Sequence, residues 1–153
     1  MNFKTTRFGA LELQESDIIH FPEGLFGFEG ERKFALLPFD PNVECPLQWL
    51  QSLQTPDLAF VVTNPFVYHP DYKISLTSDD RKKIELEEDG TISVLVIVKI
   101  PEDFTKMTAN LIAPLVVNND KMCCVQFVMT SPEYDTQHYL LPEELRTQAA
   151  TSV

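Results

Sequence analysis

Short stretches of alternating apolar and polar residues, separated by proline and glycine, run along most of the chain. The clearest is residues 91–100 (TISVLVIVKI), in which every second residue from Ile92 to Ile100 is aliphatic. A period of two is typical of a β-strand, so this face is predicted to lie in the core. Leu95 and Ile97 interrupt the polar residues of the opposite face, and the middle of that face is therefore predicted to be covered too.

Two later segments predict an antiparallel hairpin. Residues 107–117 (MTANLIAPLVV) alternate until Pro114, which predicts a bulge or a sheet edge at that point. Residues 122–130 (MCCVQFVMT) follow a polar turn at 118–120. The residues that this second strand should place on one face are Cys123, Val125, Phe127 and Met129.

Four further segments, residues 5–13, 34–37, 46–52 and 58–63, carry weaker strand patterns. The first of them is predicted to be one strand with a bend at Phe8-Gly9. Helix signals are few: Ser78 could cap a short turn, and residues 142–145 (PEEL) place proline at a first helical position with acids behind it.

Eleven prolines and five glycines leave few windows in which a long helix could form. Short strands with turn signals between them predict an all-β fold, mainly antiparallel, in the form of a small barrel-like domain with one or two short helices. Residues 1–153 are interpreted as a single domain. Its tail, residues 132–153, is predicted to be either a helix that docks on the barrel or a mobile end.

The charge balance is more informative than the rest of the composition. Asp and Glu number 23 against 12 Lys and Arg, a net charge of −11. Such a charge repels nucleic acid and anionic membranes and favours basic partners, although solubility alone would also explain it. The start of the sequence has no apolar export segment, and the apolar run 94–98 is far shorter than the ~20 residues that span a bilayer. We therefore expect a soluble, cytoplasmic protein, and three cysteines fit a reducing compartment.

A search for catalytic chemistry finds little. The histidines His20, His69 and His138 have no metal-ligand spacing. The pair His69 and Asp71 flanks a proline and is predicted to belong to a turn. Adjacent Cys123 and Cys124 point to opposite faces of a strand, which disfavours a disulfide or a shared metal. Cys123 is predicted to be core and Cys124 half-buried. The sequence therefore predicts no enzyme, no metal and no cofactor.

Charged clusters offer no alternative site. The acidic run 85–90 (ELEEDG) lacks the alternating oxygen ligands of a calcium loop and is predicted to be a solvated face that ends in an Asp-Gly turn. The basic cluster 81–83 (RKK) is too small for a nucleic-acid surface.

Residues 21–30 (FPEGLFGFEG) hold three phenylalanines and a leucine among glycines and a proline. This segment either plugs the barrel or offers apolar surface to another protein. Phe21 is predicted to be the plug, because it continues the strand-like register of Ile19. The residues predicted to be exposed are Leu25, Phe26 and Phe28.

Gly24 and Gly27 are predicted to adopt positive φ angles that turn those rings outward. Trp49, which lies between Leu47 and Leu50, is instead predicted to be a core residue.

Four stretches, read together, resemble one family. They are residues 6–13 (TRFGALEL), 21–30, 49–66 (WLQSLQTPDLAFVVTNPF) and 100–118 (IPEDFTKMTANLIAPLVVN). In order and spacing they are similar to the flagellar assembly factor FliW, from about Thr6 to Phe127. The resemblance implies a β-rich, partly barrel-like protein without enzymatic activity.

The resemblance also implies two partners. One is flagellin, bound through its C-terminal helical segment, and the other is CsrA, an RNA-binding translational repressor that the family inhibits allosterically. Neither nucleic acid nor membrane is expected to be bound directly. A groove for a helix would use the glycine-rich loop and the strand edge near Pro114. The candidate partner-binding residues are Leu25, Phe26, Phe28, Asn110, Ile112 and Pro114.

Two departures from the family pattern stand out. Phe26 occupies a position where many relatives carry proline, and residues 118–124 lack a basic, glycine-containing hairpin, so a partner contact there is in doubt. An alternative function is RNA mimicry, in which the acidic face of residues 85–89 would occupy the RNA site of a basic regulator. An enzymatic alternative would use His69 with Asp71, or Cys124.

Overall fold

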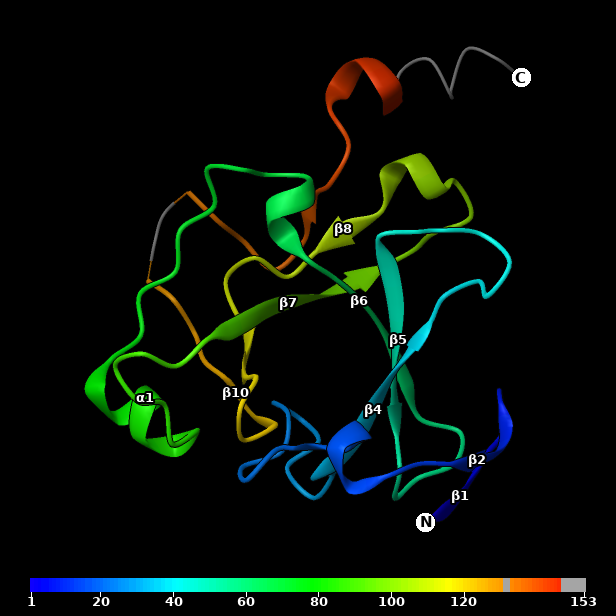
Figure 1. The fold of residues 1–153 in the computed structure, drawn as a ribbon. Coiled ribbons are helices and arrows are strands. Elements are labelled where there is room, and N and C mark those ends of the chain that lie inside the picture. The colour runs from blue at the N-terminus through cyan, green and yellow to red at the C-terminus, as the bar shows by residue number, and fades with distance from the viewer. Residues whose placement is uncertain (131–132, 147–153) are drawn as a thin grey trace.

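A computed structural model of the protein describes residues 1–130 and 133–146 (Figure 1). The strands are β1 (Asn2–Thr5), β2 (Gly9–Glu12), β3 (Ile19–His20), β4 (Lys33–Pro38), β5 (Leu47–Ser52), β6 (Ala59–Thr63), β7 (Ile92–Lys99), β8 (Thr108–Ala109), β9 (Leu115–Asn118), β10 (Cys123–Gln126) and β11 (His138–Tyr139). The helices are α1 (Ser78–Lys83), a helical turn at 143–146 and three 3-10 turns (Glu15–Asp17, Pro65–Val67 and Phe104–Lys106).

Seven strands form a closed ring. β3, β4, β5, β6 and β7 pair in sequence order, all antiparallel. β7 then pairs with β9, β9 with β10, and β10 returns to β3 through one parallel contact. Closure leaves few strand edges open, because each ring strand has a neighbour on both sides over part of its length. The all-β, mainly antiparallel, barrel-like prediction is thereby confirmed.

The two faces of the ring strands pack into separate cores. The inward face holds Phe34, Leu50, Val62, Leu95 and Leu115, all at most 6% exposed. The outward face of β7, β9 and β10 is covered by residues 68–86, β8 and β11, which together enclose a second core. Both faces of the middle of β7 are therefore covered, as the continuous apolar run 94–98 predicted.

The predicted hairpin is formed by β9 and β10, with Val116 opposite Val125. Residues 107–117 do not form one strand. β8 pairs with β7 and β11 and ends at Ala109, and β9 begins only after Pro114, so the predicted interruption is confirmed. The strands predicted at 34–37, 46–52 and 58–63 are β4, β5 and β6.

Two local predictions, on residues 5–13 and on the cap of α1, are wrong. Residues 5–13 belong to a two-stranded hairpin of β1 and β2, with Gly9 at φ +68° after the turn. The cap of α1 is Thr77, whose side chain accepts a hydrogen bond from the Asp80 N–H while Asp80 accepts one from the Thr77 N–H. The capping box therefore begins one residue before Ser78, and the helix runs from Ser78 to Lys83.

Trp49 is also not a core residue. It is half-buried on the outward face of β5, where its ring stacks on Phe39 with 5.4 Å between centroids. The Arg7 guanidinium carbon lies 4.0 Å from the centre of the same ring. The tryptophan therefore attaches the β1–β2 hairpin to the ring.

The tail contributes a strand that the sequence pattern did not indicate, β11, which pairs with β8. The predicted helix is present at 143–146, where the Arg146 N–H donates to the Pro142 carbonyl. Residues 131–132 and 147–153 of the chain lie outside the described residues. Within the described ranges, no helix is both long enough and apolar enough to cross a membrane.

Candidate protein-binding site

Residues 21–30 close one end of the ring. Phe21 follows β3 directly and is 1% exposed, with its ring edge-on to Phe34 at 4.9 Å between centroids. The prediction that Phe21 plugs the barrel is confirmed. Leu25 packs into the same core and is also 1% exposed, so its predicted exposure is wrong. In Figure 1 this loop lies among the blue segments at the bottom, to the left of the lower end of β4.

A tight turn explains why neighbouring residues of this loop differ so much in burial. The Phe28 N–H donates to the Leu25 carbonyl at 2.7 Å, and the Leu25 N–H donates back at 3.3 Å. Gly27 has φ +84°, the value that the third residue of a type II turn requires. The turn points Leu25 into the core and places Phe26 at the tip, 52% exposed.

Gly24 has φ +68°, so both predicted positive φ angles are confirmed. Here the close approach matters as well: a Cβ on Gly24 would lie 2.5 Å from the Glu29 carbonyl oxygen. A side chain at this position would push the two arms of the loop apart.

Phe28 is 40% exposed and contacts the Phe60 ring edge-on, at 5.2 Å between centroids. One side of the Phe28 phenyl group therefore packs on Phe60 at the interior of the strand ring, and the other side faces solvent. The predicted exposure of Phe26 and Phe28 is confirmed.

Gln126 joins this loop to the segment before β9. Its side-chain oxygen accepts a hydrogen bond from the Phe26 N–H at 2.9 Å, and its side-chain nitrogen donates to the Ala113 carbonyl at 3.2 Å. The two groups of candidate residues, 25–28 and 110–114, are therefore neighbours. Sequence reasoning grouped them but did not single out Gln126, whose place opposite Leu115 depends on the hairpin register.

The candidates in 110–114 are less accessible than predicted. Pro114 is buried, and Asn110 and Ile112 are half-buried. The Asn110 side-chain oxygen accepts a hydrogen bond from the Ala113 N–H at 3.1 Å, which shapes the turn between β8 and β9. Pro114 cannot contribute surface directly, because its side chain is covered.

Val128 was not predicted, yet it is 61% exposed. Residues 127–129 continue the hairpin, because the Phe127 and Met129 N–H groups donate to the Pro114 and Ile112 carbonyls. Alternation places Val128 on the same side of the strand as Gln126, and Val128 also lines a hollow with Lys73 and Ile74. The sequence carried this signal, since Phe127 and Met129 were assigned to the opposite face. We call the exposed rings of Phe26 and Phe28 the loop patch.

The residues considered for chemistry do not form a reactive centre. The His69 ring nitrogen Nε2 lies 3.0 Å from the Tyr139 carbonyl, and the ring meets that of His138 edge-on, which is a structural contact between the turn and β11. Among the described residues, no group of three His, Cys, Asp or Glu side chains could hold a metal.

The cysteine prediction is reversed. Cys124 is 1% exposed inside the ring, and Cys123 is the half-buried residue. Burial raises the pKa of the Cys124 thiol well above its usual value, so it is a poor nucleophile. The burial of the two cysteines is reversed because the interior of the strand ring is closed around Cys124, whereas the outer layer covers Cys123 only in part.

Fold and surface together place the chain in the class of small, barrel-like β-proteins that carry an exposed aromatic surface. A small ring of strands carries an exposed aromatic patch on a loop that hydrogen bonds and glycines hold in place, which is a surface suited to contact with other proteins.

Comparison with known proteins gives the family. The sequence model of the FliW protein family matches residues 2–140. A flagellar assembly factor FliW from Alkaliphilus metalliredigens is 37% identical over 148 residues, covering 97% of this chain and 91% of the relative. One from Desulfitobacterium hafniense (strain Y51) is 39% identical over 143 residues, covering 94% and 93%.

A crystal structure of a flagellar assembly factor FliW matches this fold with a TM-score of 0.84 and 35% sequence identity, covering 94% of this chain and 99% of that one. The chain belongs to the FliW family, as its motifs indicated.

Proposed function

We propose that this protein is a cytoplasmic flagellar assembly factor that binds flagellin and antagonises the translational repressor CsrA allosterically. Free protein holds CsrA away from the flagellin messenger, and newly made flagellin takes up the protein and releases CsrA. The level of flagellin thereby sets its own translation. The activity is binding alone, with no catalytic step. The observation that carries the proposal is membership of the FliW family over residues 2–140.

The loop patch suits the flagellin contact. An amphipathic helix is bound through an apolar surface that accepts side chains from one of its faces. Phe26 and Phe28 are 52% and 40% exposed, and the Gln126 hydrogen bonds hold the loop against the hairpin. A surface that is ordered before binding loses less entropy on association. The flagellin C-terminal helical segment is therefore proposed to bind here.

The net charge of −11 suits the second partner. A basic RNA-binding protein is attracted by such a charge, and an acidic protein bound beside its RNA path would repel phosphate groups.

Isothermal titration calorimetry with purified flagellin and purified CsrA tests both contacts. We expect Phe26→Ser to weaken flagellin binding at least about tenfold, because exposed aromatic anchors dominate such interfaces. Phe104→Ser is the matched control, since Phe104 is 65% exposed on the 3-10 turn after β7 and should leave flagellin binding unchanged. Absence of heat with both partners would refute the proposal.

Competition with RNA separates allosteric antagonism from RNA mimicry. Under the proposed mechanism, excess RNA reduces CsrA binding only in part, with mixed or noncompetitive behaviour. Complete displacement by RNA would instead favour direct occupation of the RNA site by the acidic residues 85–89.

A further inference from the structure

The end of the ring opposite the loop patch is open. β6 leaves β7 after Thr63, which pairs with Val96, and the chain turns into the 3-10 helix at Pro65–Val67. Behind this departure lies a cavity of about 580 Å³, a size in the range of specific binding sites. The inner-face side chains that line it are Ile19, Leu36, Leu95, Val117 and Met122.

The first half of β7 borders this cavity with a free strand edge. Ser93 and Leu95 face their partners Val117 and Leu115 on β9, and the Asn119 N–H donates to the Thr91 carbonyl in the same ladder. Because the peptide groups of a strand alternate in direction, those of Ile92 and Val94 point to the other side. β6 no longer runs there, and Pro65, which would be next in register, has no N–H and uses its carbonyl within the 3-10 turn.

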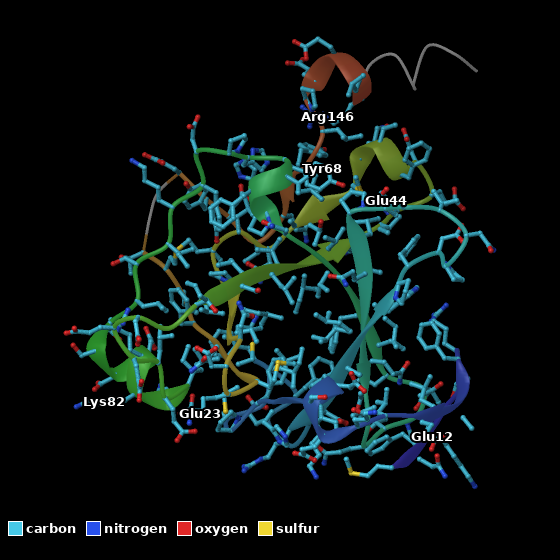
Figure 2. The ribbon with its side chains drawn as sticks, in the orientation of Figure 1. Glu12, Glu23, Glu44, Tyr68, Lys82 and Arg146 are labelled. Carbon is cyan, nitrogen blue, oxygen red and sulfur yellow. The ribbon has the colours of Figure 1, made fainter. Side chains whose placement is uncertain are left out.

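The charges around the cavity indicate which kind of ligand the open end would accept. The lining of the cavity contains no charged residue among those described. A second hollow, of about 660 Å³, shares Gln48 and Asn64 with the cavity, and its only charged lining residues in the described chain are Asp40 and Glu44. Figure 2 shows Glu44 on the loop between β4 and β5. Glu23, on the loop of residues 21–30, lies at the other end of the strand ring.

Apolar surface accompanies these carboxylates. Val43 is 59% exposed and Val67 is 57% exposed, and both line the second hollow. The Gln48 side chain lies at the junction of the two hollows and makes no hydrogen bond within the described residues. The combined surface thus offers an apolar cavity, a free strand edge, a polar junction and two acids.

We propose that this open end binds an extended, basic segment of a partner protein. The segment adds as a strand along Ile92–Val94, inserts one apolar side chain into the cavity, and places lysine or arginine beside Asp40 and Glu44. Strand addition satisfies the free backbone groups, the anchor removes apolar surface from water, and the acids select basic sequences. This site is separate from the loop patch and does not depend on the proposed function.

Fluorescence anisotropy with labelled nonapeptides tests the proposal on the full chain. The probe alternates lysine and valine around a central leucine, with blocked ends. We expect Gln48→Arg to weaken binding at least about tenfold by adding a cation at the junction, and Gln48→Glu to preserve or strengthen binding. Phe26→Ser is expected to leave it unchanged. Failure of the native protein to bind the probe, or equal affinities of the two Gln48 variants, would overturn the proposal.

Altered probes test each component separately. Replacing the central leucine with aspartate should abolish binding if the cavity holds the anchor, and replacing lysine with glutamate should abolish it if the acids select the sequence. Methylation of the backbone nitrogens on one edge of the peptide should abolish strand addition. An altered probe that binds as well as the original contradicts the corresponding part of the proposal.

Amide chemical shifts locate the contact. The probe should perturb Ile92–Leu95 and Asn64 and leave Phe26–Glu29 unchanged, whereas the reverse pattern would assign the peptide to the loop patch and refute the proposal. Sedimentation of the free protein tests whether a second copy is the occupant, and a monomer is expected. Dimerisation that Gln48→Arg abolishes would show that the open end binds this chain itself, and the proposal would be wrong. Loss of flagellin or CsrA binding alone leaves these readouts unaffected.

Discussion

The two ends of the strand ring differ in how their apolar interior is covered. At one end the chain itself supplies the plug, because Phe21 and Leu25 fill the interior and are each 1% exposed. At the other end none of the described residues takes that place, and a cavity of about 580 Å³ remains beside a free strand edge. The difference shows that the apolar interior of one strand ring can be filled by the chain at one end, which stabilises the fold. At the other end the same interior leaves apolar surface accessible to a ligand.

The plug end is expected to be far more sensitive to truncation than the open end. Phe21→Ala removes a fully buried ring and should cost about 3–5 kcal/mol of the free energy of unfolding. Leu36→Ala removes a half-buried side chain that already borders the cavity, and it should cost at most about 2 kcal/mol. Chemical denaturation measures both. Equal costs would show that the two ends are packed alike.

Gly24 provides the next largest effect. Gly24→Ala forces a side chain into a positive φ and against the Glu29 carbonyl, so it should destabilise the protein by more than about 2 kcal/mol. Gly27→Ala meets the same φ restriction but has open space around the added methyl, and about 1 kcal/mol is expected. Thermal unfolding of the pair separates close approach from backbone strain. A larger effect at Gly27 would contradict this account.

Gln126 should contribute through its two hydrogen bonds. Gln126→Met keeps the length of the side chain and leaves the Phe26 N–H and the Ala113 carbonyl unpaired, at an expected cost of about 1–2 kcal/mol. Hydrogen exchange at the Phe26 amide should accelerate more than exchange in β5. Unchanged exchange at Phe26 would mean that Gln126 does not hold the loop.

The smallest effect compares one added methylene at two positions of the interior. Val117→Ile grows into the cavity and should stabilise the protein by about 0.5 kcal/mol. Val62 is fully buried and does not line the cavity, so Val62→Ile should destabilise it by about 1 kcal/mol. Denaturation midpoints give the sign of each. Destabilisation by both variants would indicate that the cavity collapses in solution.

Local patterns were sufficient for most of the strands. Period-two alternation located β4 to β7 and the β9–β10 hairpin, because alternation reflects which face of a strand meets an apolar layer. Short elements were missed or misread. β11 has two residues and depends on pairing with β8, and β1 and β2 form a hairpin that is stabilised by Arg7 on Trp49, a contact between distant segments.

The candidate site was predicted in part for the same reason. Glycines at 24 and 27 indicated an unusual loop, and Phe26 and Phe28 are exposed as predicted. Leu25 was misplaced because the direction of one side chain in a turn depends on what lies below it, here the interior of the ring. Cys123 and Cys124 were assigned to opposite faces correctly, but the more buried face could not be known until both covering layers were in place.

The sequence by itself determined the strand class, the positions of the main turns, the acidic charge and the aromatic loop, since each follows from residue type and spacing over a few positions. Only the tertiary structure decided which end of the ring is filled, which loop residues face outward, and that the departure of β6 leaves Ile92 and Val94 without a partner strand on the side away from β9. These features arise from contacts between residues far apart in the chain, and no local pattern encodes the space that ring closure leaves empty.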